Sequence, residues 1–193
     1  MVGEGPSPGV SRRLVAFLRG INLGGRRLKM AELRGHLGAL GLQDVATFLA
    51  SGNVVFDAPD DGRRDLAAVE EAIEAHLEEA LGYDVGTLVR PLRDLGRIPR
   101  LDVVVDAIEG GFTPHVIFVK ESVEPAMVAA LGALEDGDDR FHALEREILW
   151  LRRGRMSDAP FSTRELETAL GGVVNTMRNL NTVRRIVARF APT

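Results

Sequence analysis

The sequence of 193 residues contains no cysteine and few aromatic residues. The absence of cysteine excludes disulfide bonds, thiolate metal sites and catalysis by a cysteine nucleophile. Phenylalanine, tyrosine and tryptophan make up only 5% of the residues, which is too few for an evident platform on which nucleic-acid bases stack. No apolar run approaches the roughly 20 residues of a membrane-spanning helix. We therefore expect no membrane partner.

The overall composition is that of a folded globular protein, with 45% hydrophobic residues, 27% charged residues and a net charge of -4. Only two of its 24 basic residues are lysines, Lys29 and Lys120. The net negative charge argues against a general nucleic-acid coat protein but allows a local basic patch. Residues 1–11 are rich in glycine and proline and lack the apolar core of a signal peptide. They predict a disordered tail on a cytoplasmic protein.

The apolar pattern of residues 12–92 predicts the element order β-α-β-β-α-β. A continuous apolar run over Leu14–Leu18 is typical of a strand buried on both faces. The string Ala50-Ser51-Gly52-Asn53 indicates a tight hairpin between the second and third strands. The predicted strands are 14–18, 45–49, 54–56 and 85–89, and the predicted helices follow the apolar residues from Met30 to Leu40 and from Leu66 to Ala80.

The second half repeats this order of elements, although not its residues. Pro125 suits the first turn of a helix, Ser162 and Glu165 form a capping box, and Leu180 to Phe190 predict an additional C-terminal helix. Asn179 or Asn181 is expected to cap that last helix. The predicted strands are 115–119, 140–144, 148–151 and 173–177.

This order favours an α+β fold made of two ferredoxin-like units, also called α-β plaits. The first unit spans 12–92 and the second spans 113–193 with the C-terminal helix. Residues 93–112, with Pro99 and a glycine pair, predict a linker with one helical turn. Because the first strand of each unit is apolar on both faces, helices on one face cannot cover it alone. We expect either that the two units pack together or that the linker and the last helix cover the free sheet faces.

The most informative stretch for function follows the first strand. Its glycines let a ligand approach the backbone closely, and its cations surround the start of a helix, which is an arrangement suited to an anion. Neither a P-loop nor a dinucleotide-binding fingerprint is present. The alternative is a sharp turn that needs glycine for its dihedral angles, with solvated arginines outside it. The stretch contains Arg19, Gly20, Asn22, Gly24, Gly25, Arg26, Arg27 and Lys29.

Topology brings the hairpin toward this stretch. In a split βαβ unit the first two strands are parallel, so the turn after the first strand and the hairpin after the second lie at the same sheet edge. This places Ser51, Gly52 and Asn53 near Arg19 and Asn22. The result is either a small polar pocket or a plain hairpin in which Asn53 adopts a left-handed conformation.

Other residues offer little chemistry. The four histidines are isolated, with no HxxxH or HxH spacing, so the sequence predicts no histidine metal site and no cofactor. His36 and His76 are predicted to be partly exposed packing residues within helices. The carboxylates between Glu70 and Glu79 are assigned to the solvated face of an amphipathic helix. The sequence offers no histidine or carboxylate pair placed to act as an acid or base, and it has no GxSxG string. These residues therefore do not predict an enzyme. Arg178 has no evident local role, which makes it a candidate ligand contact or a structural tie.

Three strings resemble those of the bacterial domain of unknown function 1697 family. They are VAFLRGINLGG at 15–25, continued by KMAEL at 29–33, then SGNVVF at 51–56, and TMRNLNTV at 176–183. The resemblance spans nearly the whole chain and implies two α-β plaits without an established activity. The chain departs from the family where members commonly show Ser-Lys-Leu before the penultimate helix, since it has Ala159-Pro160-Phe161 there. It also has Ile98-Pro99-Arg100 in place of an Asn-Pro-Phe string.

These observations leave three hypotheses. The first is a non-catalytic binder of a small anion, a nucleotide or an RNA segment. The second is a structural or interaction module without a ligand, and the third is an enzyme that acts on a phosphorylated metabolite. The residues proposed to bind the ligand under the first hypothesis are Arg19, Gly20, Asn22, Gly24, Gly25, Lys29, Ser51, Asn53 and Arg178.

Overall fold

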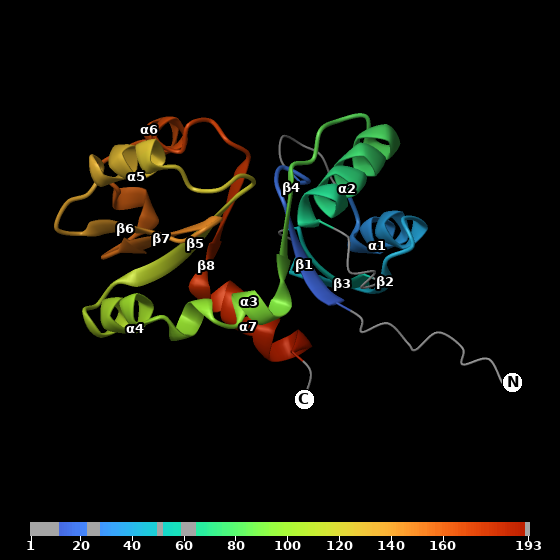
Figure 1. Ribbon diagram of the computed structural model, residues 1–193, viewed down its shortest axis with the longest axis horizontal. Coiled ribbons are helices and arrows are strands. Elements are labelled where there is room, and N and C mark those ends of the chain that lie inside the picture. Colours follow the sequence, from blue (N-terminus) through green and yellow to red (C-terminus); the bar gives the residue numbers. More distant parts are fainter. Residues whose placement is uncertain (1–11, 23–27, 50–51, 59–64, 192–193) are drawn as a thin grey trace, which may run out of the picture. The chain divides into compact units, whose positions relative to one another are not determined.

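The computed structural model describes residues 12–22, 28–49, 52–58 and 65–191 (Figure 1). Their strands form two four-stranded antiparallel sheets accompanied by helices, which confirms the predicted α+β class. The chain divides into two units, residues 1–93 and 94–193. The predicted disordered tail, residues 1–11, lies outside the described part of the chain.

The first unit has the predicted order β-α-β-β-α-β. Its strands occur in the sheet in the order β2-β3-β1-β4, and every neighbouring pair is antiparallel. Helices α1 and α2 lie on one face of this sheet (Figure 1). The elements are β1 (Arg12–Leu18), α1 (Met30–Ala39), β2 (Gln43–Phe48), β3 (Asn53–Ala58), α2 (Leu66–Leu81) and β4 (Thr87–Pro91).

The core of the first unit follows from the apolar run of β1. Leu14, Ala16 and Leu18 pack with the buried residues of α1 and α2 in one hydrophobic cluster. Because side chains alternate along a strand, Val15 and Phe17 point to the opposite face of the sheet, and they are fully buried as well. The strand is therefore buried on both faces, as its composition predicts.

The second unit repeats the strand order as β6-β7-β5-β8, again antiparallel throughout. Helices α5 and α6 lie on one face of this sheet, and α4 and α7 lie on the other (Figure 1). The elements are α4 (Asp102–Glu109), β5 (Thr113–Val119), α5 (Pro125–Gly132), β6 (Asp139–Ala143), β7 (Glu147–Arg152), α6 (Thr163–Ala169), β8 (Asn175–Asn179) and α7 (Leu180–Phe190), with short helical turns at α3 (Leu92–Leu95), Ile98–Arg100 and Met156–Asp158.

Two predicted helix caps are present in the second unit. The Glu165 N–H donates to Ser162 Oγ at 3.2 Å, and the Ser162 N–H donates to the Glu165 carboxylate at 2.7 Å, which closes the capping box. At the start of α7, the Asn181 N–H donates to Asn179 Oδ1 at 2.8 Å. Asn179 is thus the last residue of β8 and the cap of α7, and no loop separates the two elements.

Several predicted segments differ from the structure; β4 spans Thr87–Pro91 and not 85–89, and β2 spans Gln43–Phe48 and not 45–49. β8 begins at Asn175 and not at residue 173, because Gly171 and Gly172 both have a left-handed φ, +70° and +71°, and delay the extended backbone. The segment 93–112, predicted as a linker with one helical turn, contains α4 and two shorter helical turns. The structure gives the physical reason, since Val104 and Ala107 on α4 are buried.

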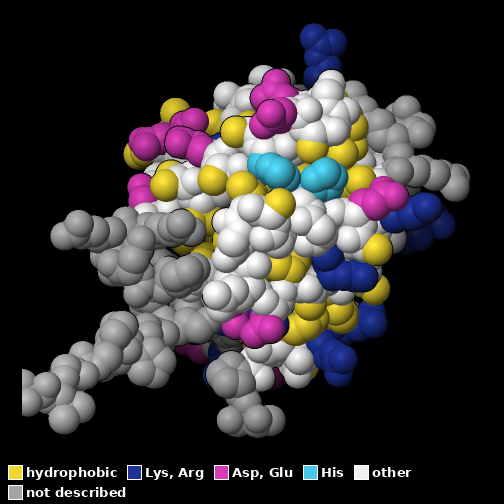
Figure 2. Space-filling view, turned by 90° about the vertical axis from the view of Figure 1, so that its right-hand side faces the viewer, with side chains coloured by type: hydrophobic (Ala, Val, Ile, Leu, Met, Phe, Trp, Pro, Cys, Tyr) yellow, Lys and Arg dark blue, Asp and Glu magenta, His cyan; other side chains and the backbone are white. Residues whose placement is uncertain are grey.

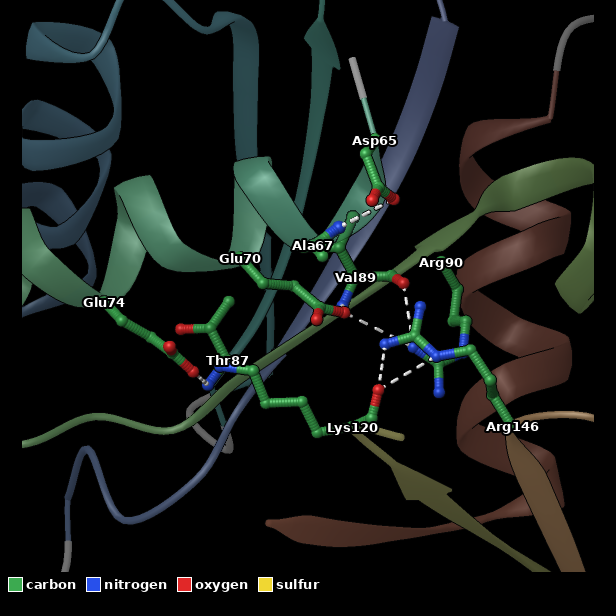
Figure 3. Close-up of polar contacts among 9 residues, drawn as sticks. All are labelled: Asp65, Ala67, Glu70, Glu74, Thr87, Val89, Arg90, Lys120 and Arg146. Carbon is green, nitrogen blue, oxygen red and sulfur yellow. Dashed lines mark hydrogen bonds and ion pairs between the residues drawn. The ribbon is translucent and has the colours of Figure 1, made fainter. Parts of the chain in front are cut away.

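Two backbone N–H groups of the edge strand β4 donate hydrogen bonds to glutamate side chains of α2. The Val89 N–H donates to Glu70 Oε1 at 2.7 Å, and the Thr87 N–H donates to Glu74 Oε1 at 2.8 Å (Figure 3). Glu70 has no exposed surface and also pairs with the buried Arg90 at 3.5 Å. The prediction that Glu70 lies on a solvated face is therefore wrong, because the N–H groups of an edge strand need acceptors when they are buried.

This contact predicts unequal effects for two adjacent glutamates. Glu70→Ala removes the carboxylate that serves both the Val89 amide and the Arg90 guanidinium, so we expect it to lower the free energy of unfolding by about 3 to 5 kcal/mol. Glu71→Ala changes an exposed side chain and should stay within about 0.5 kcal/mol of the original. Urea unfolding of the two variants measures the difference. Similar losses in both variants would contradict the buried role of Glu70.

Candidate functional site

The turn after β1 is fastened to two other segments of the first unit. The Leu18 N–H donates to the Gly52 carbonyl at 2.8 Å, and the Arg19 N–H donates to the Gly86 carbonyl at 2.7 Å. Gly52 also lies against the side chains of Leu18 and Ile21. The part of the β2–β3 hairpin that the structure describes is therefore close to the turn.

Two glycines of this region are needed for different reasons. Gly20 has φ +76°, and within the described part of the chain, its two chain neighbours aside, no heavy atom lies within 4 Å of where a Cβ would stand. Gly52 has φ +73°, and a Cβ there would be 3.1 Å from Ile21 Cγ2 and from the Leu18 carbonyl oxygen. The first glycine serves the backbone conformation alone, whereas the second also permits close packing.

The two asparagines of the turn and hairpin bind backbone groups. Asn22 Oδ1 accepts a hydrogen bond from the Leu28 N–H at 2.9 Å, which joins the two described ends of the loop between β1 and α1. Asn53 is fully buried and donates from Nδ2 to the Phe48 carbonyl at 2.9 Å. The alternative in which Asn53 adopts a left-handed conformation is wrong, because Gly52 and Leu49 take the positive φ angles and Asn53 begins β3.

The cations of the turn stand at its two described ends. Arg19 is half-buried directly after β1, and Lys29 is exposed directly before α1. The Lys29 N–H donates to the Glu32 carboxylate at 3.3 Å, which satisfies one amide at the start of this helix. The remaining predicted residues of the site, Gly24, Gly25 and Ser51, lie outside the described residues, as do Arg26 and Arg27.

Arg178, the last predicted site residue, belongs to the second unit. It lies on β8 and donates from Nη1 to Thr176 Oγ1 at 2.7 Å and to the Met177 carbonyl at 2.8 Å. Burial lowers the pKa of Arg178 to about 10, since removal from water disfavours the charged guanidinium. The two hydrogen bonds show that the Arg178 side chain has structural partners on its own strand.

A second arginine occupies the same register position in the first unit. Arg90 on β4 stands opposite Val15, as Arg178 on β8 stands opposite Val116. Arg90 Nη1 donates to the preceding carbonyl, that of Val89, at 2.9 Å, which matches the bond from Arg178 to its own preceding residue. The equivalence of Arg90 and Arg178 is not evident in the sequence, because their neighbours differ, but the strand register shows it.

The second unit also contains a buried polar cluster that was not predicted from the sequence. Asp139 has no exposed surface and pairs with Arg152, whose exposed fraction is 3%. The indole Nε1 of Trp150 donates to Asp139 Oδ1 at 2.7 Å, and Arg152 Nε donates to the Arg155 carbonyl at 2.7 Å. Its only sequence signal is the presence of polar residues at the ends of apolar strands.

His115 on β5 adjoins this cluster and is 8% exposed. Its ring lies 5.9 Å from the Trp150 ring between centroids, its Nε2 is 3.4 Å from Asn179 Nδ2, and its buried Nδ1 has no hydrogen-bond partner among the described residues. Burial lowers the pKa of His115 below its ordinary value, and the positive charge of Arg152 contributes in the same direction. Both effects favour the neutral form of the imidazole over the charged form.

Further chemistry is limited in the described part of the chain. No group of three or more histidine, aspartate or glutamate side chains there is arranged to hold a metal ion. No helix in the same residues has both the length and the apolar character needed to cross a membrane.

The lowered pKa of His115 predicts a pH effect on stability. Below the ordinary pKa of about 6.5 the unfolded chain takes up a proton that the folded chain resists, so the free energy of unfolding falls as the pH falls. We expect His115→Gln to flatten this fall, by at most about 1.4 kcal/mol per pH unit for one proton. Urea unfolding between pH 7 and pH 5 measures it. The exposed His142, changed to Gln, is the control and should parallel the original chain.

The close packing of Gly52 predicts a second effect. Gly41 has φ +76°, and none of the described residues other than its chain neighbours has a heavy atom within 4 Å of its would-be Cβ, so Gly41→Ala should cost only the conformational term of about 1–2 kcal/mol. Gly52→Ala must also displace Leu18 or Ile21, and we expect a clearly larger loss of thermal stability. Equal shifts in melting temperature would show that the hairpin does not press against the turn.

Comparison with known proteins places this architecture among uncharacterised proteins. A family model described as "Protein of unknown function (DUF1697)" matches residues 12–149. The solved structure of the conserved bacterial protein SP0830 from Streptococcus pneumoniae is similar, with a TM-score of 0.71 and 22% sequence identity over 93% of this chain and 98% of that one. At this identity the likeness shows a shared fold alone. None of the curated proteins matches the chain.

Proposed function

Because the chain belongs to the DUF1697 family of proteins of unknown function, we propose a function from its geometry: non-catalytic binding of a small phosphate-bearing anion at the turn after β1. The observation that carries this proposal is the position of Gly20, which has φ +76° and, among the described residues other than its chain neighbours, no heavy atom within 4 Å of its would-be Cβ. An anion can approach the backbone there without displacing a side chain of the described residues.

The surroundings of Gly20 support an anion. Arg19 precedes it, and Lys29 is the exposed residue before α1. Asn22 and Asn53 act as positioning residues, since their side chains bind the backbone of the turn and the hairpin. Backbone held in one conformation before binding loses less entropy when the ligand arrives.

A non-catalytic role is supported by the residues present. The described residues of the turn, 19–22 and 28–29, contain no histidine and no carboxylate that could transfer a proton. A small anion is favoured over an RNA segment because the chain has few aromatic residues and a net charge of -4.

A specific observation also favours the second candidate, a structural module without a ligand. The Asn22 and Asn53 amides are engaged within the protein, which a fold requirement would explain equally well. Under this reading the chain binds no anion, and Asn22→Ala only lowers the melting temperature.

We further propose that each unit has the ferredoxin-like arrangement and that the chain arose by duplication of one such unit, with 12–92 and 113–193 as the two copies. The equivalent strand orders, β2-β3-β1-β4 and β6-β7-β5-β8, support this proposal. The arginines at the same register position, Arg90 and Arg178, support it independently.

Calorimetric titration with inorganic phosphate and ADP at low salt tests the anion site. A charge-assisted hydrogen bond contributes roughly 1.5 to 3 kcal/mol, so Lys29→Gln and Arg19→Gln should each weaken binding about tenfold or more. Arg164→Gln is the matched control, because Arg164 is an exposed cation in the first turn of another helix. Its affinity should equal that of the original chain.

The titration also separates the two candidates. Failure of the original chain to bind either probe, or an equal loss in the Arg164→Gln variant, would overturn the anion site. A lowered melting temperature in Asn22→Ala without any binding by the original chain would support the structural module.

A further inference from the structure

Two histidines that are 40 residues apart meet on the surface of the first unit. His36 on α1 and His76 on α2 have ring centroids 5.4 Å apart and an angle of 64° between their planes. Figure 2 shows histidine side chains (cyan) next to each other on this face. Both side chains are partly exposed, as the sequence predicts, but their proximity was not predicted.

The two rings stand on a rigid support. His36 lies between Leu33 and Leu37 on α1, and His76 lies beside Ile73 and Leu77 on α2. These four apolar residues are at most 1% exposed and belong to one hydrophobic cluster. Core packing therefore fixes the distance between the two helices, and with it the separation of the histidine backbones.

One nitrogen of the pair has an unsatisfied hydrogen-bonding capacity. His76 Nε2 is buried and has no hydrogen-bond partner among the described residues. A buried polar group left in this state costs about 1 to 3 kcal/mol, and such a group calls for an explanation by function or by an ion. A cation bound by this nitrogen would supply its missing partner.

The rings meet edge to face, and their separation also allows the two imidazoles to share one metal ion. A Zn–N bond of about 2.0–2.1 Å, extended by about 1.1 Å from the nitrogen to the ring centre, places each centroid about 3.2 Å from the metal. At a tetrahedral angle of about 109°, the two centroids are then about 5.2 Å apart. The observed value is 5.4 Å.

We propose that His36 and His76 form a surface site for one divalent transition-metal ion, with zinc as the reference ion. Imidazole nitrogen suits Zn²⁺, Ni²⁺ and Cu²⁺, and does not suit Mg²⁺ or Ca²⁺, which prefer oxygen. No group of three protein ligands exists in the described residues, so water completes the coordination shell. The bound ion joins α1 to α2 across the surface of the unit.

This site is independent of the proposed anion site. Its ligands lie on helices α1 and α2, and none of them belongs to the turn after β1. Loss of anion binding would therefore leave metal binding unchanged, and the two proposals fail separately.

Calorimetric titration of the full chain with ZnCl₂ tests the site. We expect one equivalent of Zn²⁺ to bind and to raise the melting temperature, and EDTA to reverse the rise. His36→Gln and His76→Gln each leave a single ligand, so each should weaken binding at least about tenfold. His142→Gln is the matched control, because His142 is an exposed histidine on β6 in the second unit. It should bind Zn²⁺ as the original chain does.

A second measurement guards against variants that fold poorly. The electron paramagnetic resonance spectrum of the original chain with one equivalent of Cu²⁺ should show nitrogen couplings from two imidazoles, and this requires no substitution. Circular dichroism and melting without metal establish that each glutamine variant folds. Absence of Zn²⁺ binding, couplings from fewer than two nitrogens, or an equal loss in His142→Gln would overturn the proposal.

Discussion

The end of β1 is held by two main-chain hydrogen bonds, from Leu18 to Gly52 and from Arg19 to Gly86, and the first unit is organised around them. They bring the β2–β3 hairpin and the segment before β4 to the same point. The close approach is possible because Gly52 has no side chain where a Cβ would stand 3.1 Å from the Leu18 carbonyl. Because the end of the strand is fixed in this way, Asn22 can accept a hydrogen bond from the Leu28 N–H. The backbone at Gly20 is then held in a defined position.

Much of this arrangement could be predicted from the sequence because its signals are local. The apolar run Leu14–Leu18 predicts a strand buried on both faces, and the Ser162–Glu165 pair predicts a helix start. The position of the hairpin beside the turn follows from topology once the first two strands are taken as parallel. One of the two alternatives for the hairpin placed the left-handed conformation at Asn53, whereas Gly52 and Leu49 adopt it.

The features that escaped prediction all depend on which elements pack against each other. The burial of Glu70 requires an edge strand whose amides face α2, as the bond to Val89 shows. The pairing of His36 with His76 requires two helices at a given distance, which spacing within one helix does not reveal. In the second unit, register places the charged Arg152 next to Asp139 on neighbouring strands. None of these contacts has a sequence motif.

The most direct test of the central claim is a nuclear magnetic resonance titration of the ¹⁵N-labelled full chain with inorganic phosphate. If the turn after β1 binds the anion, the backbone amide signals of 19–22 and 28–30 move in a saturable way, while those of the second-unit helices stay in place. If all amide signals stay fixed, or if the shifts concentrate elsewhere in the chain, the turn is a structural element of the fold and not a binding site.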